Sequence, residues 1–356
     1  MSTMVLPTTT TEYDYDYSTD SSITPCFLDT ADSLGTAFRP VLLWVVCVVG
    51  LLGNGLVLWV LALHRVRTMA DVCLLNLALA DLLLALLLPL WTRAGVGSDL
   101  MNAALCKVTA GMYQLGFTSG LLFVTLMSLD RYLAIVHAVA SSAVRKLRYS
   151  VLVSAAVWVA AATLALVKAL FTISDDDGKC LVDYPTKTRK LVHNFTEISV
   201  CLGVCLPTLT FCYVRILVVV RQQRSSKKSR AVRLIFAIVC AFTVFWVPYY
   251  VAVLLQTLHH DLDLWSWCQM SQHLTVAVEV TEIVALTHCC VNPVIYAFVG
   301  EKFKKGFALA FARHPLCVKL CPLAYTVTST YSKPSDNDTS NTAVSSARLE
   351  NVEKDY

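Results

Sequence analysis

The sequence predicts an all-α protein, a seven-transmembrane helix bundle with an extracellular N-terminus and a short amphipathic cytoplasmic eighth helix. Three observations lead to this fold class. The composition is 56% hydrophobic and only 15% charged, and the mean hydropathy is +0.61. Seven apolar runs are long enough to cross a bilayer. The basic residues between these runs are unevenly divided between alternate loops. The composition excludes a soluble protein, because a chain this apolar would lack the polar groups to cover its surface.

Each apolar run is expected to form one helix. About 20 apolar residues in a helix cross the roughly 30 Å of bilayer hydrocarbon, and a helix bonds its own backbone groups where water is absent. Only the second run carries a charge, at Asp81. In chain order the runs are residues 41–63, 72–90, 108–129, 149–167, 198–214, 234–258 and 283–299.

The loops predict the orientation of the bundle. Those after runs one, three and five hold more Lys and Arg than those after runs two, four and six, which also carry acids such as Asp175–Asp177. The positive-inside rule places the first set in the cytoplasm, so the N-terminus is outside and the C-terminus inside. Orientation and contact with anionic membrane lipids account for the inner basic residues, and no nucleic-acid partner is implied.

The chain is accordingly divided into four parts. Residues 1–37 are expected to be a disordered, acidic extracellular segment with no cleavable signal peptide, since they hold no Lys or Arg. Residues 38–300 form the seven-helix domain. Residues 301–312, where Lys and Phe alternate in a helical pattern, are expected to lie on the membrane surface. Residues 313–356 are expected to be a disordered, Ser/Thr-rich cytoplasmic tail.

Cysteines suggest two outer bridges and a lipidation site. Of fourteen, eight lie within apolar runs and are expected to behave as small apolar residues. Four lie outside, and sequence alone does not choose among their three pairings. A Cys106–Cys180 bridge would staple the second outer loop over the bundle and leave Cys26 for Cys268; free thiols are the alternative. Cys317 and Cys321 follow the surface helix and are palmitoylation candidates, or else plain tail cysteines.

Polar residues inside the membrane are costly and therefore suggest function. Asp81, Asn54 and Asn292 lie at similar depth and are expected to form one buried network. This network either joins helices by hydrogen bonds or acts as a switch that holds a cation or a proton, and a sodium ion is the only cofactor considered.

Two further features suggest moving parts. Asp130-Arg131-Tyr132 closes the third run, where an Asp130–Arg131 ion pair is a releasable latch or Arg131 simply anchors the inner edge. Four runs contain a proline that frees a carbonyl and permits a kink. Trp246 lies beside one of these and either couples a kink to the bundle interior or packs as core. The four prolines are Pro89, Pro207, Pro248 and Pro293.

Together these residues resemble the rhodopsin-like (class A) G-protein-coupled receptors over residues 40–312. The motifs stand in the expected runs and order, and each is weak alone. They are Gly53-Asn54, Leu77 to Asp81, Asp130-Arg131-Tyr132, Trp158, Trp246-Val247-Pro248 and Asn292-Pro293-Val294-Ile295-Tyr296.

Three segments resemble the CC chemokine receptors more narrowly: SLDRYLAIVHA at 128–138, RAVRLIF at 230–236 and THCCVNPVIYAFVGEKFK at 287–304. The four outer cysteines also fit that family. In span five of that family the proline usually stands eight residues before a tyrosine, whereas Pro207 stands six residues before Tyr213. This departure implies either a shifted kink or raised basal activity.

The resemblance assigns a ligand site. Glu282 matches a glutamate that meets a basic group of the ligand, with a purely internal cation such as Lys168 or Arg93 as the alternative partner. Trp91, Tyr113 and Tyr249 match pocket aromatics. In the N-terminal segment, acid-flanked tyrosines resemble sulfation sites that would attract a basic protein; a solvated tail is the alternative. These tyrosines are Tyr13, Tyr15 and Tyr17.

The implied function is that of a plasma-membrane receptor for CC-type chemokines, which signals to heterotrimeric G proteins of the inhibitory class and to arrestin, in leukocyte chemotaxis or calcium signalling. Span six is expected to swing about Pro248 while Tyr296 and Arg131 reorganise. Asn194 begins an outer glycosylation sequon. A scavenging receptor, a constitutively active receptor encoded by a virus, and a seven-helix channel or transporter are the alternatives. Neither a catalytic constellation nor a metal site is predicted, so an enzyme is not expected.

Overall fold

A computed structural model gives the three-dimensional arrangement of the chain. It describes residues 32–63, 66, 68–96, 102–137, 147–222, 236–237, 239–260 and 268–299. The predicted eighth helix, the tail and most of the N-terminal segment lie outside these residues. Within them, seven helical spans are long and apolar enough to cross a membrane, which confirms the predicted bundle. The spans are Phe38–Leu63, Met69–Arg93, Ala103–Val136, Arg148–Leu170, Lys187–Arg221, Val239–His259 and Met270–Ile295.

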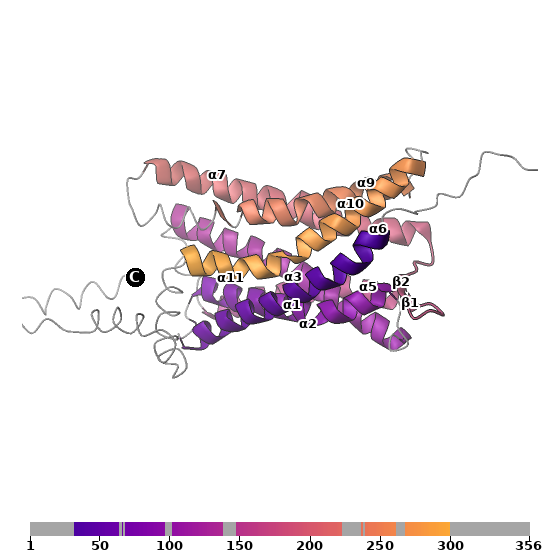
Figure 1. Cartoon of the computed structure of the whole chain (residues 1–356). Coiled ribbons are helices and arrows are strands. Elements are labelled where there is room, and N and C mark those ends of the chain that lie inside the picture. Colours follow the sequence, from indigo (N-terminus) through magenta and orange to yellow (C-terminus); the bar gives the residue numbers. More distant parts are fainter. Residues whose placement is uncertain are drawn as a thin grey trace, which may run out of the picture.

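The spans run lengthwise beside one another, with α3 inside the bundle (Figure 1). Eighteen residues of α3 are buried, and they include polar and aromatic side chains of the bundle interior. Four spans are single helices, and three are interrupted. The elements are α1 (Asp32–Leu63), α2 (Met69–Val96), α3 (Ala103–Val136), α5 (Leu147–Leu170), α6 (Lys187–Ile198), α7 (Leu206–Gln222), α9 (Val247–His260), α10 (Cys268–Leu286) and α11 (His288–Val299).

Two boundaries differ from the sequence prediction. Helix α1 begins at Asp32, so the last residues of the predicted N-terminal segment are helical. The seventh span begins well before residue 283, because α10 starts at Cys268. Glu279 and Glu282 therefore lie within a helix and not ahead of it, which fixes the height and direction of the Glu282 side chain.

Prolines mark the interruptions. In span six a turn at Trp246 precedes α9, whose second residue is Pro248. In span seven a turn at Thr287 separates α10 from α11, which contains Pro293. Since proline has no N–H to donate, each frees the carbonyl four residues earlier. In the second span, by contrast, Pro89 lies inside the continuous helix α2.

Span five contains a π-helix, η1 (Ser199–Cys205), between α6 and α7. Its closing bond runs from the Leu206 N–H to the Cys201 carbonyl, five residues back. Pro207 follows directly and cannot close a normal turn. The unusual Pro207–Tyr213 spacing therefore coincides with wider winding on the N-terminal side of the proline, a feature that often accompanies functional sites.

A short hairpin adds to the predicted all-α fold. Strands β1 (Thr172–Ser174) and β2 (Cys180–Val182) pair antiparallel, and Gly178 adopts a positive φ of 71° in the turn. The backbone N–H of Lys179 donates to Asp175 Oδ1 at 2.6 Å. Cys180 is bonded to Cys106 at the start of α3, with 5.4 Å between their Cα atoms. The predicted staple of this loop is thereby present.

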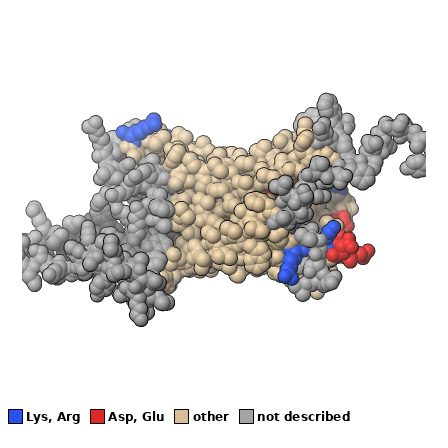
Figure 2. Space-filling view, viewed as in Figure 1, with Lys and Arg blue, Asp and Glu red and all other residues tan. Residues whose placement is uncertain are grey.

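The surface is that of a membrane protein. Large apolar side chains are exposed along the spans, among them Leu52 at 69% and Leu152 at 68%. Figure 2 shows a broad middle band almost free of charged residues, with Lys and Arg at both ends and acidic residues gathered near the hairpin. Such a band fits contact with lipid hydrocarbon. Of the eight cysteines within the spans, Cys240 is exposed, Cys290 half-buried and the others buried.

Candidate functional site

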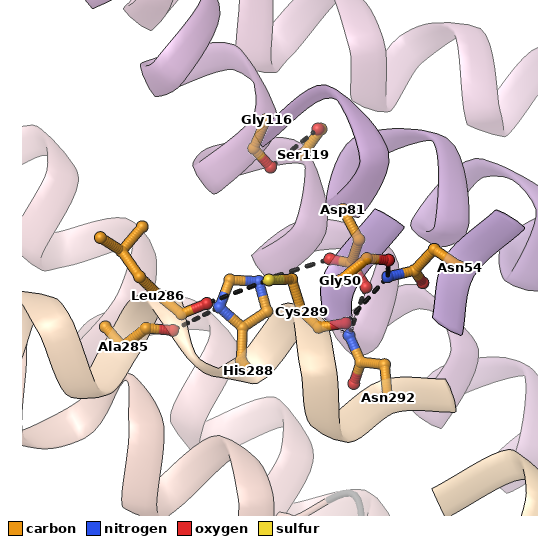
Figure 3. Close-up of polar contacts among 10 residues, drawn as sticks. All are labelled: Gly50, Asn54, Asp81, Gly116, Ser119, Ala285, Leu286, His288, Cys289 and Asn292. Atoms are coloured by element: carbon orange, nitrogen blue, oxygen red, sulfur yellow. Dashed lines mark hydrogen bonds and ion pairs between the residues drawn. The ribbon is translucent and has the colours of Figure 1, made fainter. Parts of the chain in front are cut away.

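Of the predicted polar network, Asp81 and Asn292 bond directly in the bundle core, whereas Asn54 meets α11 through a backbone carbonyl (Figure 3). Asn292 Nδ2 donates to Asp81 Oδ2 at 2.8 Å. Asn54 contacts neither side chain, because its Nδ2 donates to the carbonyls of Cys289 at 2.8 Å and Gly50 at 3.0 Å. All three predicted residues are buried. The network therefore joins α1, α2 and α11, partly through backbone.

Pro293 explains why Asn54 bonds to Cys289. The Cys289 carbonyl is four residues before Pro293, so the helix offers it no N–H, and an unpaired buried carbonyl is costly. The Asn54 amide supplies the missing donor across the interface. Gly53 permits this approach, since a Cβ there would lie 2.9 Å from Pro293 Cγ. The Gly53-Asn54 pair of α1 therefore meets the Asn292-Pro293 segment of α11 at a single contact between the two helices.

His288 is a member of the network that the sequence analysis missed. Its Nε2 lies 3.4 Å from Asp81 Oδ1, and both side chains are 1% exposed. Its ring also packs against Trp246, with centroids 4.2 Å apart, and edge-on against Phe117 at 6.0 Å. A signal was available: His288 is four residues before Asn292, so the two share one helix face.

The groups that the described residues place around Asp81 do not form the oxygen cage that a sodium ion needs. Hard cations take oxygen ligands, but in the described part of the chain the Asp81 oxygens face nitrogens of Asn292 and His288. Helix α3 presents Gly120 there, which has no side-chain oxygen. The Ser119 hydroxyl donates to the Gly116 carbonyl at 3.2 Å.

Towards the hairpin end of the bundle, the predicted ligand residues lie together. The Tyr113 hydroxyl donates to Glu282 Oε1 at 2.8 Å. Trp91 stacks on the Tyr113 ring with centroids 4.1 Å apart and planes 9° from parallel. Phe117 joins this stack to Tyr249, which it meets edge-on at 5.6 Å. Helices α2, α3, α9 and α10 therefore build one aromatic cluster around a single carboxylate.

The cation paired with Glu282 is neither of the two alternatives that the sequence suggested. It is Arg39 of α1, whose Nη2 lies 3.8 Å from Glu282 Oε2. Lys168 instead donates to Gln114 Oε1 at 3.0 Å, with its ammonium 5.5 Å from the centre of the Tyr113 ring. Arg93 is exposed at the end of α2. The long Arg39 side chain reaches Glu282 from a position that the apolar pattern did not single out.

At the opposite end of α3, the predicted latch is closed. Arg131 Nη2 lies 3.1 Å from Asp130 Oδ2, and the two side chains are 28% and 1% exposed. Tyr132 packs edge-on against Phe211 of α7 at 5.4 Å and lies 3.1 Å from His137 through its hydroxyl. The pair holds a half-buried guanidinium against a buried carboxylate, an arrangement that a binding partner can open.

Trp158 links α5 to α2. Its Nε1 donates to Asn76 Oδ1 at 2.8 Å, and its ring meets Phe123 of α3 at 5.7 Å. The Asn76 amide also donates to the Val72 carbonyl at 2.8 Å and contacts the Ser154 hydroxyl at 3.4 Å. This second group of polar contacts joins α5 to α2. Asn76 belongs to it and was not named in the sequence analysis.

The remaining predicted residues are described in part or not at all. Asn194 is half-buried, and its Nδ2, the atom that would carry a glycan, donates to Thr257 Oγ1 at 3.1 Å. A glycan would take one of the two hydrogens of this nitrogen and would need room beside Thr257. Tyr296 lies in α11 and Cys268 begins α10, but their side chains are outside the described residues, as are the following residues entirely: Tyr13, Tyr15, Tyr17, Cys26, Cys317 and Cys321.

Comparison with known proteins adds one family match and three similar receptors. A family model described as 7 transmembrane receptor (rhodopsin family) matches residues 53–296. The chain is 41% identical over 306 residues to C-C chemokine receptor type 8 of Mus musculus, covering 84% of this chain and 86% of that protein. The receptor of the same name from Homo sapiens is 40% identical over 316 residues, covering 86% and 87%. CX3C chemokine receptor 1 of Mus musculus is 40% identical over 291 residues, covering 80% and 81%.

Proposed function

The chain belongs to the rhodopsin family of seven-transmembrane receptors and groups within it with the chemokine receptors, and from this premise we propose that it binds CC-type chemokines and signals to heterotrimeric G proteins of the inhibitory class. It is a receptor and not an enzyme. We further propose that it resides in the plasma membrane with its N-terminus outside. The observation that carries the proposal is the Glu282 carboxylate, held by Tyr113 at the hairpin end of the bundle.

A half-buried carboxylate in an aromatic cluster suits a cationic ligand. Charge-assisted hydrogen bonds to a carboxylate are the stronger kind, and aromatic faces attract a cation as well. The basic N-terminus of a chemokine would bring such a group to Glu282, with Trp91, Tyr113 and Tyr249 around it. The globular part of the chemokine would dock on the acidic N-terminal segment, where sulfated Tyr13, Tyr15 and Tyr17 would add negative charge and speed encounter.

The His288 contacts suggest how ligand binding reaches the inner end. A ligand that binds the active conformer more tightly shifts the population towards it. Repacking of the aromatic cluster moves Phe117, which touches the His288 ring, and His288 touches both Trp246 and Asp81. Span six then swings about Pro248 and Arg131 leaves Asp130, which opens a groove for a helix of the G protein.

The tail is proposed to regulate this output. Phosphorylation of its Ser and Thr residues would add the charge that arrestin recognises. Palmitoylation of Cys317 and Cys321 would hold the stretch 301–312 on the membrane. A bridge between Cys26 and Cys268 would tie the N-terminal segment to α10, close to the ligand site.

The main alternative is a receptor that binds chemokine without G-protein output. The closed Asp130–Arg131 pair favours a signalling receptor, because a latch that opens on activation has no use in a pure scavenger. A constitutively active receptor would activate the G protein without ligand. A measurement of G-protein activity in the absence of chemokine therefore distinguishes it from a receptor that depends on ligand.

A chemokine panel tests the proposal. Cells expressing the full chain are exposed to CC and CX3C chemokines, and binding, cAMP and arrestin recruitment are read in parallel. We expect at least one CC chemokine to bind and to lower stimulated cAMP in a manner blocked by pertussis toxin. Binding without any cAMP or calcium response would leave the scavenging alternative, and response to CX3C chemokines alone would overturn the CC assignment. Epitope tags at both ends of the chain test its orientation.

A further inference from the structure

The two oxygens of Glu282 have unequal partners. Oε1 accepts a bond from the Tyr113 hydroxyl at 2.8 Å, whereas Oε2 faces Arg39 Nη2 at 3.8 Å. The first partner is fixed in place, because Tyr113 is buried, stacked on Trp91 and covered by the Lys168 ammonium. The second comes from a long side chain on α1. A cation from a ligand is therefore expected to replace the partner of Oε2 and to leave the Tyr113 bond to Oε1 in place.

The Arg39 contact has the properties of a displaceable pair. Its distance of 3.8 Å is long for an ion pair, and the Arg39 side chain is 33% exposed while that of Glu282 is 14% exposed. A long ion pair between half-buried side chains that water can still reach contributes little, since water competes for both charges and the long side chain loses freedom when it is held. A better-placed cation would readily replace the guanidinium.

We infer that Arg39 is an internal counter-ion that a cationic group of the ligand must replace at Glu282 Oε2, and that it thereby helps to determine which ligands the receptor accepts. The inference rests on the proposed function and deepens it. Ligands that place an ammonium or guanidinium group at this depth recover the charge pairing that they disrupt. Ligands without such a group leave Arg39 in place and compete with it only for space.

The sequence itself would not suggest this role. Lys168 is another cation of the same cluster, but it is engaged by Gln114 and by the Tyr113 ring. It also interacts electrostatically with Glu197, which is paired with His193 at 2.9 Å. Among the described residues, Arg39 is the cation within ion-pairing distance of Glu282. Its removal is therefore expected to change Glu282 without changing the Lys168 contacts.

A mutant cycle on the full receptor tests the inference. The probe is the labelled chemokine with the highest wild-type affinity in the panel described above, measured on membranes with wild-type receptor, R39Q, E282Q and the double variant. We expect R39Q to raise affinity by about two- to fivefold, the equivalent of a weak ion pair, and to have no effect in the E282Q background. Arg93→Gln, which removes another outer arginine, is the matched control and should leave affinity unchanged.

Three results would overturn the inference: unchanged affinity in R39Q, reduced affinity in R39Q with normal surface expression, or the same gain in both backgrounds. A ligand-free measurement separates it from the proposed function. In detergent at low salt, R39Q should lower the melting temperature by about 1–2 °C, and only when Glu282 is present. If this coupling is found but no chemokine binds, the proposed function fails and the pair stands; if it is absent, the counter-ion inference fails whatever the panel gives.

Discussion

The ring of Trp246 lies against the ring of His288, with centroids 4.2 Å apart and planes at 42°. His288 is also 3.4 Å from Asp81, so one side chain touches both the kinked span and the polar network. Protein interiors are closely packed, and a movement of Trp246 therefore requires His288 to move or repack. This contact gives the bundle a direct physical connection between the aromatic cluster and its buried charge.

Replacing His288 by Phe should separate these two contacts. The aromatic ring would still pack on Trp246, but Asp81 Oδ1 would lose the nitrogen it faces. A phenyl ring offers nothing polar to a buried carboxylate that is shielded from water, which is destabilising. We expect a lower melting temperature for H288F in detergent, and a smaller effect of H288F when Asp81 is already Asn. Additive losses in the two single variants would contradict a direct His288–Asp81 contact.

Two glycines that lie two residues apart, and therefore on different sides of α1, test the packing of α1 on α11. A Cβ at Gly53 would lie 2.9 Å from Pro293 Cγ, whereas nothing lies within 4 Å of a Cβ at Gly55. G53A should therefore force the helices apart, weaken the Asn54–Cys289 bond and destabilise the receptor by about 1–3 kcal/mol. G55A should be neutral or stabilising. Equal melting temperatures for the two variants would exclude this tight interface.

The latch between Asp130 and Arg131 should restrain basal activity. Asp130→Asn keeps the shape but removes the charge that holds Arg131 at 3.1 Å. If this loss shifts the equilibrium by about 1 kcal/mol, the active population rises roughly fivefold. Nucleotide exchange on a purified G protein without chemokine measures the change. R131A is expected to abolish exchange while surface expression persists, and full exchange in R131A would refute the assignment of Arg131 as the switch.

The two glutamates of α10 offer a matched pair for ligand binding. Glu282 accepts from Tyr113 and faces Arg39, whereas Glu279, one turn nearer the start of the helix, is exposed. E282Q should weaken binding of an active chemokine by about tenfold or more, because a charged hydrogen bond is worth about 1.5–3 kcal/mol. E279Q should have little effect. Equal losses would point to general acidity of the outer surface and not to a site at Glu282.

Much of this architecture is readable from the sequence, because burial in a bilayer is a local property. A run of about 20 apolar residues predicts a span wherever it occurs, and all seven were found. The Asp130–Arg131 pair was predicted for the same reason, since its members are neighbours in the chain. Asp81 and Asn292 were predicted as partners because both are polar groups where few exist.

The sequence left open which residues meet between helices. Asn54 was expected beside Asp81 but bonds to the carbonyl that Pro293 frees, and Glu282 pairs with Arg39 instead of Lys168 or Arg93. His288 was overlooked in an apolar run. Such contacts depend on how far each helix is rotated and shifted against its neighbours, which packing across the whole bundle decides. The sequence by itself determined which segments are buried in the membrane, and only the tertiary structure decided which buried polar groups bond to one another.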